Sequence, residues 1–153
     1  MGARDTLRLE KGYLLSGQDF LWPGLGIEPD ATLPDGFLSR DSAETAVPYG
    51  LDIEHDFVGR ERVLASLESG PRWDGLICLE RGPSPRPGHA VLSSEAEDAE
   101  PLGYVTSGGP SPSLERKGIA MAYLEGAEQG QEVWIQASPR RRVRAQVCRP
   151  PFV

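Results

Sequence analysis

The apolar positions near the start of the chain recur with the period of a helix. One face would carry Ala3, Leu7, Glu10 and Leu14, with Leu9 and Tyr13 beside it. This spacing predicts an amphipathic helix over 3–15. Gly12 costs about 1 kcal/mol relative to alanine inside a helix, which makes it a candidate for the helix end.

The middle of the chain is polar and rich in proline and glycine. Residues 17–48 contain the turn sequences "WPGLG" and "LPDG", and a connection this long usually lines a site or covers a groove. After it the pattern predicts a short strand over 49–53 and a helix over 59–68. The helix would bury Val63, Leu64 and Leu67, and Gly70–Pro71 would end it.

Beyond Pro71 the apolar residues fall into short runs with a strand-like pattern. There are six of them: "WDGLICLE", "HAVLSS", "PLGYVTSG", "GIAMAYLE", "QEVWIQA" and "RVRAQVCR". Turns separate most of them and no helix is predicted between them, which indicates a closed or nearly closed antiparallel barrel. The predicted fold class is therefore α+β, with a helix and strand segment in residues 1–70 and a β-barrel domain in residues 71–153.

The last two runs form a predicted hairpin around "SPRR". Val143, Ala145 and Val147 point to one side of the second strand, and Arg142 and Arg144 point to the other. We interpret these arginines as the solvated face of an edge strand.

Composition excludes several functional classes. The net charge of −7 argues against a general nucleic-acid or anionic-membrane binder. No apolar stretch approaches the roughly 20 residues that a membrane span requires, so a cytoplasmic location is the default expectation. Cys78 and Cys148 lie far apart in the sequence, and His55 and His89 are isolated. We therefore predict no metal site and no disulfide.

Arg4 is a candidate binding residue. A cation in the first helical turn opposes the helix dipole, although Asp5 offsets part of this effect. The simple interpretation is a solvated arginine. The alternative is that Arg4 faces an anion, because a guanidinium pairs well with a carboxylate.

Three longer motifs resemble one family. "GARDTLRLEKGYLLSGQDF", "GLDIEHDFVGRERV" and "GYVTSGGPSPSLERKGIAMAYL" occur in the order found in the C-terminal half of the glycine cleavage system T protein, the aminomethyltransferase, and "PPFV" matches its closing strand. The motifs span about 120 residues and occur in the same order as in the family. Both facts argue against a chance similarity.

The resemblance implies a reaction and a fold. T proteins take the aminomethyl group from the lipoyl arm of H protein, release ammonia and pass the one-carbon unit to tetrahydrofolate, without a metal. Their three regions surround a folate channel, and the last region is a small Greek-key β-barrel. By this resemblance Arg4 belongs to the folate site, and Tyr13 would line the pterin or aminobenzoate side. Core packing is the alternative for Tyr13.

The resemblance also implies what is missing. The catalytic aspartate of the family lies in its N-terminal region, which this sequence does not include. We interpret Asp5, Asp19, Asp52 and Asp56 as caps, turn residues or surface charges. No catalytic residue is therefore predicted, and the chain alone is expected to be inactive. It would be a fragment, a mis-started gene product or a split subunit whose partner is a separately encoded N-terminal half.

Other functions remain open at this point. The segment also resembles the folate modules of dimethylglycine and sarcosine oxidases, although no flavin fingerprint is present. A non-catalytic folate-binding or scaffold protein is a second alternative, but relatives that assist iron–sulfur assembly carry cysteine where this chain has Tyr13. Binding of single-stranded nucleic acid through Arg140–Arg144 is disfavoured by the net charge.

Overall fold

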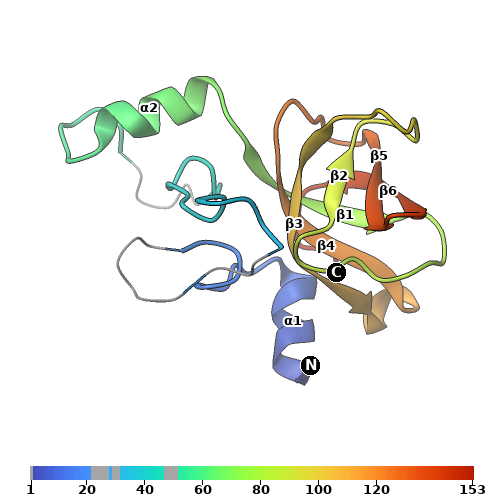
Figure 1. Cartoon of the computed structure of the whole chain (residues 1–153). Coiled ribbons are helices and arrows are strands. Elements are labelled where there is room, and N and C mark those ends of the chain that lie inside the picture. Colours follow the sequence, from blue (N-terminus) through green and yellow to red (C-terminus); the bar gives the residue numbers. More distant parts are fainter. Residues whose placement is uncertain (1, 22–27, 29–31, 47–51) are drawn as a thin grey trace.

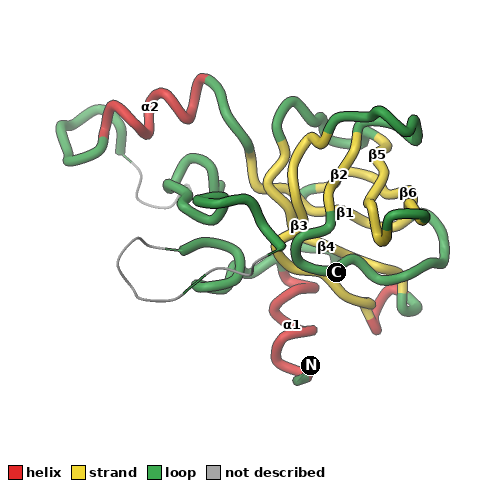
Figure 2. Tube along the Cα trace, in the orientation of Figure 1, coloured by secondary structure: helices red, strands yellow, loops and turns green. Residues whose placement is uncertain are grey.

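The chain folds into a β-barrel with two helices and long connections on one side (Figure 1). This computed structural model describes residues 2–21, 28, 32–46 and 52–153. Figure 2 shows that loops dominate before α2 and strands after it. The elements, in chain order, are α1 (Ala3–Lys11), α2 (Arg60–Glu68), β1 (Arg72–Cys78), β2 (Ala90–Leu92), β3 (Pro101–Ser111), the 3-10 turn η1 (Pro112–Leu114), β4 (Lys117–Leu124), β5 (Glu132–Ser138) and β6 (Arg141–Cys148).

The barrel is closed and antiparallel, in the order β1-β4-β3-β2-β5-β6. Strands β2 to β4 form a meander and β1 lies beside β4, which is the Greek-key arrangement. The predicted fold class and the six strands are thus confirmed. The edge-strand interpretation of the last hairpin is wrong, because β6 pairs with β5 on one side and with β1 on the other. The outward arginines of β6 therefore lie on the outer surface of a closed sheet.

Strand β4 explains where the core lies. It is buried on both faces from Gly118 to Leu124, which accounts for its unbroken apolar sequence. Alternate residues of β4 point into the barrel, where they pack with side chains from all the remaining strands. The outward-pointing Ile119 and Met121 pack instead with Leu9 of α1 and Phe152 of the C-terminal tail. The barrel interior contains Leu76, Cys78, Val91, Val105, Ala120, Ala122, Leu124, Val133, Ile135, Val143, Ala145 and Val147.

Helix α1 ends at Lys11, four residues before the predicted limit. Gly12 follows it in the left-handed conformation with φ 72°, and its N–H bonds back to the last turn. A side chain here is excluded on two grounds. The conformation favours glycine, and an added Cβ would lie 2.3 Å from Cβ of Pro150. Gly12 therefore both ends the helix and allows the tail to approach it.

The buried face of α1 differs in part from the predicted one. Leu9 and Glu10 face the barrel, whereas Leu7 is 63% exposed and Tyr13 is 67% exposed. Leu9 and Glu10 belong to the predicted face and are buried as expected, and hydrogen bonds from Ser111 and Ser113 hold the Glu10 carboxylate, whereas the exposure of Leu7 and Tyr13 was not predicted. Periodicity alone could not give this orientation.

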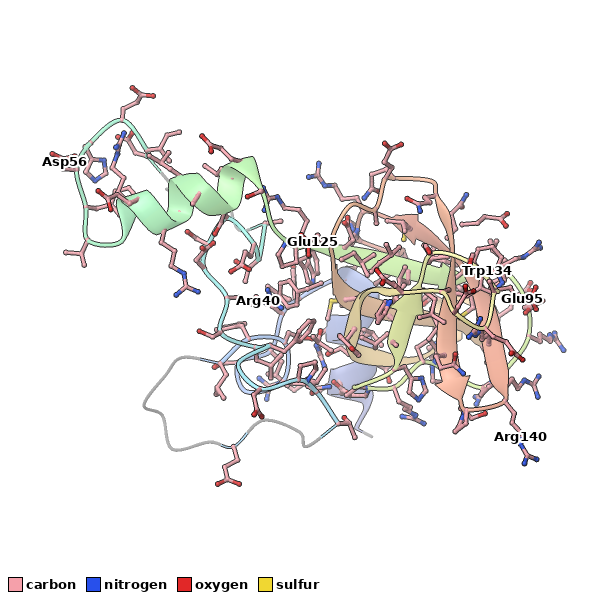
Figure 3. The ribbon with its side chains drawn as sticks, turned by 45° about the horizontal axis from the view of Figure 1, so that its top comes forward. Arg40, Asp56, Glu95, Glu125, Trp134 and Arg140 are labelled. Atoms are coloured by element: carbon pink, nitrogen blue, oxygen red, sulfur yellow. The ribbon has the colours of Figure 1, made fainter. Side chains whose placement is uncertain are left out.

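Helix α2 confirms the helix predicted over 59–68. Val63 is buried, Leu64 is half-buried and Leu67 is 43% exposed, so the predicted buried side was right for Val63, right in part for Leu64 and wrong for Leu67. In Figures 1 and 3 the helix extends away from the barrel. Residues 49–51 of the predicted strand lie outside the described residues, and 52–53 are not in a strand. The domain division after residue 70 stays a prediction.

Candidate functional site

The outer side of α1 borders a hollow of about 640 Å³. Its lining consists of Gly2, Arg4, Asp5, Arg8, Tyr13, Leu14 and Leu15. The two predicted ligand contacts therefore lie at the same hollow. Arg4 is exposed and has no hydrogen bond or ion pair with the described part of the chain. The exposure of Tyr13 argues against the alternative of core packing for this residue.

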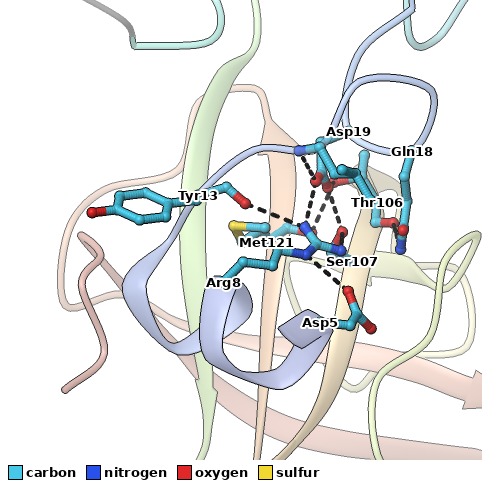
Figure 4. Close-up of polar contacts among 9 residues, drawn as sticks. Asp5, Arg8, Tyr13, Gln18, Asp19, Thr106, Ser107 and Met121 are labelled. Carbon is cyan, nitrogen blue, oxygen red and sulfur yellow. Dashed lines mark hydrogen bonds and ion pairs between the residues drawn. The ribbon is translucent and has the colours of Figure 1, made fainter. Parts of the chain in front are cut away.

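Arg8, one helical turn after Arg4, is fully engaged inside the protein (Figure 4). Its Nε donates to Asp5 Oδ1 at 2.9 Å, and its terminal nitrogens donate to Asp19 Oδ2 at 2.6 Å and Ser107 Oγ at 3.0 Å. One of them also reaches the carbonyl oxygen of Tyr13 at 3.3 Å. Two arginines on one helical face thus have different states, since Arg8 is paired and Arg4 is free to meet a ligand.

Asp19 is the centre of this polar network and is completely buried. Its Oδ1 accepts hydrogen bonds from Thr106 Oγ1 at 2.6 Å and Ser107 Oγ at 2.5 Å. Its Oδ2 accepts from Arg8 and from the N–H of Leu15 at 2.9 Å. Asp19 is therefore more than the turn residue that its sequence suggested. It joins the turn after α1 to strand β3.

A bulge in β3 makes this junction possible. The register of β3 against β4 shifts between Val105 and Ser107. In a regular strand the side chains of neighbouring residues point to opposite faces, but a bulge breaks this alternation. The hydroxyls of Thr106 and Ser107 consequently reach the same carboxylate oxygen.

Glu10 forms a second polar link between α1 and the barrel. Its buried carboxylate accepts from Ser111 Oγ at 2.5 Å, and from the N–H and the hydroxyl of Ser113, each at 3.0 Å. The hydrogen bond from Ser111, followed by that from the Ser113 N–H, lowers the pKa of Glu10. The ionised form of Glu10 therefore holds the helix.

The connection after α1 is attached to the barrel by an aromatic cluster. The Arg40 guanidinium lies 4.4 Å from the ring centre of Phe37 and 4.6 Å from that of Tyr123, and it pairs with Glu44 at 2.8 Å. Phe37 also meets Tyr104 edge to face. Figure 3 shows Arg40 where the connection approaches the barrel. The sequence indicated only that this connection would line a site or cover a groove, and in the structure 37–44 covers the outer face of β3 and β4.

The α1 hollow is suited to binding more than to proton transfer. It offers a free guanidinium, an exposed phenol ring and two leucine side chains, which fit a ligand with an anionic group and a flat apolar body. Asp5 is the carboxylate in its lining, and it is paired with Arg8. Asp19 is sealed below the surface by its four donors. Asp19 is therefore not placed to exchange protons with a bound molecule, and Asp5 is held in an ion pair through Oδ1.

Asp52, Asp56 and the two thiols offer no alternative centre in the described part of the chain. Asp52 pairs with His55 on the surface at 3.3 Å, and Asp56 lines a shallow hollow before α2. Burial raises the pKa of Cys78 and of Cys148 to about 11, so both thiols stay protonated near neutral pH. The described residues contain no group of three potential metal ligands. Among them there is also no helix long and apolar enough to cross a membrane.

A third hollow, of about 290 Å³, lies near the β3–β4 hairpin. Charged side chains of both signs line it: Glu80, Arg81, Glu115, Arg116 and Lys117. It lacks an aromatic side chain, and it is less than half as large as the α1 hollow. Of these two, the α1 hollow is the stronger candidate for a ligand with a ring, while the hollow before α2, of about 670 Å³, is similar in size but more open.

Sequence reasoning named Arg4 and Tyr13 as ligand contacts, which stay predictions, and it did not identify the contacts of Arg8, Asp19 and the two hydroxyls. The signal for Arg8 was present, because it lies four residues after Arg4 on the same face. The signal for Asp19 was hidden, because its partners in β3 follow it by 87 and 88 residues.

Comparison with known proteins agrees with this fold. Residues 75–153 match the family described as the glycine cleavage T-protein C-terminal barrel domain. The chain is 40% identical over 157 residues to the aminomethyltransferase of Parafrankia sp., and 39% identical over 153 residues to that of Staphylococcus carnosus. It covers 37% and 36% of these proteins, while 100% and 97% of the chain is aligned.

A solved structure gives the same result. The glycine cleavage system aminomethyltransferase T from Bartonella henselae superposes with a TM-score of 0.68 at 30% sequence identity. The match includes 99% of this chain and 38% of that protein. The chain thus spans little more than a third of the length of these relatives and matches their C-terminal part.

Proposed function

The chain belongs to the glycine cleavage T-protein family, and from this premise we propose that it provides the folate-binding wall and the barrel of an aminomethyltransferase. The complete reaction would transfer the one-carbon unit from the aminomethyl-lipoyl arm of H protein to tetrahydrofolate and release ammonia. Tetrahydrofolate is then the acceptor, and H protein is a partner.

The observation that carries this proposal is that Arg4, which has no hydrogen-bond or ion-pair partner among the described residues, lines the same hollow as the exposed ring of Tyr13. Folate combines a flat ring system with a tail that ends in carboxylates. A guanidinium binds a carboxylate through charge-assisted hydrogen bonds, and an aromatic ring can stack on the flat part. Arg8 is already engaged, so Arg4 is the arginine of this helix that can meet the tail.

We further propose that the reacting carboxylate comes from a separate polypeptide segment. The acids near the hollow, Asp5 and Asp19, are both committed to Arg8. The relatives are more than twice as long as the aligned region, so a front part of the family fold is available as the source. The outward Leu7, Tyr13 and Leu15 would be partly covered by that part.

The proposal predicts activity that depends on complementation. The purified chain should not release ammonia from glycine in the presence of the other cleavage-system components. Adding the N-terminal part of a related aminomethyltransferase, together with lipoylated H protein and tetrahydrofolate, should give glycine-dependent ammonia release. Turnover by the chain alone would contradict the assignment of the reacting group.

Substitution of Arg4 tests the role of the guanidinium in that assay. Arg4→Ala should raise the KM for tetrahydrofolate by about tenfold or more, because a hydrogen bond to a charged group contributes about 1.5–3 kcal/mol. Arg140→Ala is the matched control, since Arg140 is an exposed arginine at the far end of the barrel (Figure 3). An unchanged KM in Arg4→Ala would refute the folate contact.

One observation favours a second candidate, a folate-binding protein without turnover. The carboxylate that lines the hollow is paired, so the site can hold a ligand without reacting with it. Folate binding by the chain, with no ammonia release under any complementation, would support this alternative over the first.

A further inference from the structure

We infer that Asp19 is a positioning residue for the ligand-facing segment of the hollow, and that the β3 bulge fixes its carboxylate. The inference rests on the proposed function, because it concerns the wall that would meet folate. Asp19 does not line the hollow itself. It acts through two residues that do, Tyr13 and Leu15.

The first step is the attachment of Asp19 to the barrel. Thr106 and Ser107 have no solvent exposure, and both donate their hydroxyl hydrogens to Oδ1 of Asp19. Their shared direction depends on the bulge between Val105 and Ser107. The position of the carboxylate is therefore set by strand β3, which belongs to the most deeply buried part of the molecule.

The second step leads from Asp19 to the wall of the hollow. Oδ2 accepts the N–H of Leu15 directly, at 2.9 Å. It also holds Arg8, whose guanidinium reaches the carbonyl oxygen of Tyr13 at 3.3 Å. The carboxylate of Asp19 thus fixes the backbone on both sides of Leu14. Figure 4 shows the polar contacts that connect this carboxylate with the turn.

The ion pair and hydrogen bonds of Asp19 indicate that this residue positions the turn after α1 more than it stabilises the fold. A buried ion pair often stabilises a fold no better than apolar side chains of similar size, because both charges lose their hydration. The hydrogen bonds of such a pair, however, have defined directions, and here each of the two carboxylate oxygens of Asp19 accepts two hydrogen bonds. An apolar contact would attach the turn to the barrel without fixing the orientation of Tyr13.

The hydroxyls of the bulge allow a controlled test. Thr106→Val removes one donor to Asp19 and keeps the shape, whereas Thr106→Ser keeps the donor. Ser107→Ala removes the second donor. Ser113→Ala is the matched control, because Ser113 also donates to a carboxylate that ties α1 to the barrel, but through Glu10. Each full-length variant is titrated with 5-formyltetrahydrofolate, a stable reduced folate, and unfolded in urea.

The inference predicts a specific pattern. Thr106→Val and Ser107→Ala should weaken folate binding by about five- to tenfold, close to the net contribution of one ordinary hydrogen bond, because each removed hydroxyl acts on the ligand only through Asp19. Thr106→Ser should restore the wild-type affinity. Ser113→Ala should bind within about twofold of wild type even where its stability falls as much as that of Ser107→Ala.

Two results would overturn the inference. One is wild-type affinity in both Thr106→Val and Ser107→Ala, and the other is an equal loss of affinity in Ser113→Ala, which would show a general effect of stability. If the wild-type chain binds no reduced folate, the proposed function fails and amide exchange decides the positioning role. Faster exchange of the Tyr13 and Leu15 amides in Thr106→Val, but not in Ser113→Ala, supports it, and unchanged exchange contradicts it.

Discussion

The barrel and helix α1 are held together by different forces. The barrel closes around apolar side chains from all six strands. Helix α1 contributes one deeply buried apolar residue, Leu9, and is otherwise attached through the carboxylates of Glu10 and Asp19 and the guanidinium of Arg8. The barrel therefore depends on burial, which tolerates small shifts, and the helix depends on hydrogen bonds, which do not.

This difference suits a binding wall on a rigid scaffold. Hydrogen bonds with fixed directions place α1 and the turn after it with respect to β3. The barrel therefore holds the residues that line the hollow in defined positions, although these residues are themselves exposed. The following predictions, from the largest effect to the smallest, test whether the two regions differ in this way.

The largest effect is expected in the barrel. Leu76 is fully buried in the interior, so Leu76→Ala should lower the free energy of unfolding by about 3 kcal/mol through lost burial and a cavity. Leu67→Ala, at a partly exposed position on α2, should change it by less than about 1 kcal/mol. Urea unfolding followed by circular dichroism measures both, and equal losses would contradict a stability centred on the barrel.

An intermediate effect with a clear pH dependence is expected at Glu10. Its pKa in the folded protein lies below its ordinary value of 4.5, so its contribution is complete above that value and is lost as the pH falls through the lowered pKa. Glu10→Gln should therefore be less stable than wild type at pH 7, and the difference should shrink as the solution is acidified.

Thermal unfolding of both proteins between pH 7 and about pH 3 measures this difference. Amide exchange in α1 at the same pH values shows whether the helix is the part that loosens. A stability difference that is constant with pH would mean that the charge of Glu10 does not hold the helix.

The smallest effect is expected at Asp74 in β1, with the opposite sign. Burial raises its pKa from an ordinary 3.8 to about 6, although a hydrogen bond from Gln129 opposes the shift. A raised folded-state pKa means that stability is lost as the pH rises from about 4 through about 6. Asp74→Asn should therefore be slightly more stable than wild type at pH 7.

The pH dependence of Asp74→Asn shows whether the carboxylate of Asp74 in the barrel differs from that of Glu10 in α1. Below about pH 4 the advantage of Asp74→Asn should vanish, because the wild-type carboxyl is then protonated in both the folded and the unfolded states. A loss of stability in Asp74→Asn at pH 7 would show that this barrel carboxylate supports the fold in the way that Glu10 supports the helix.

The sequence predicted the barrel more completely than the site, for a physical reason. Alternation of apolar residues is a local property, so the six strands could be placed directly. Closure joins β1 to β6, which are distant in the sequence, and the outward arginines of β6 were therefore assigned wrongly to an edge. The buried face of α1 was predicted only in part, since Leu9 and Glu10 are buried as expected but Leu7 is exposed, and the partner that holds Glu10 lies about 100 residues away.

The sequence named two exposed residues of the candidate site, whose role stays a prediction, but it did not indicate the contacts among the buried ones. Arg4 and Tyr13 were found from a motif, and they line one hollow. The role of Asp19 depends on a strand bulge that reverses the direction of a single hydroxyl. No local pattern in "SGQDF" or "GYVTSGG" indicates that these two segments meet.

The contact between Arg4 and an anionic tail is most directly tested by comparing two ligands on two proteins. The wild-type chain and Arg4→Gln are each titrated with tetrahydrofolate and with tetrahydropterin, which lacks the carboxylate tail. Wild type should bind tetrahydrofolate about tenfold more tightly than tetrahydropterin, and Arg4→Gln should lose most of that preference while its affinity for tetrahydropterin stays the same. Equal affinities of wild type and Arg4→Gln for tetrahydrofolate would contradict the account.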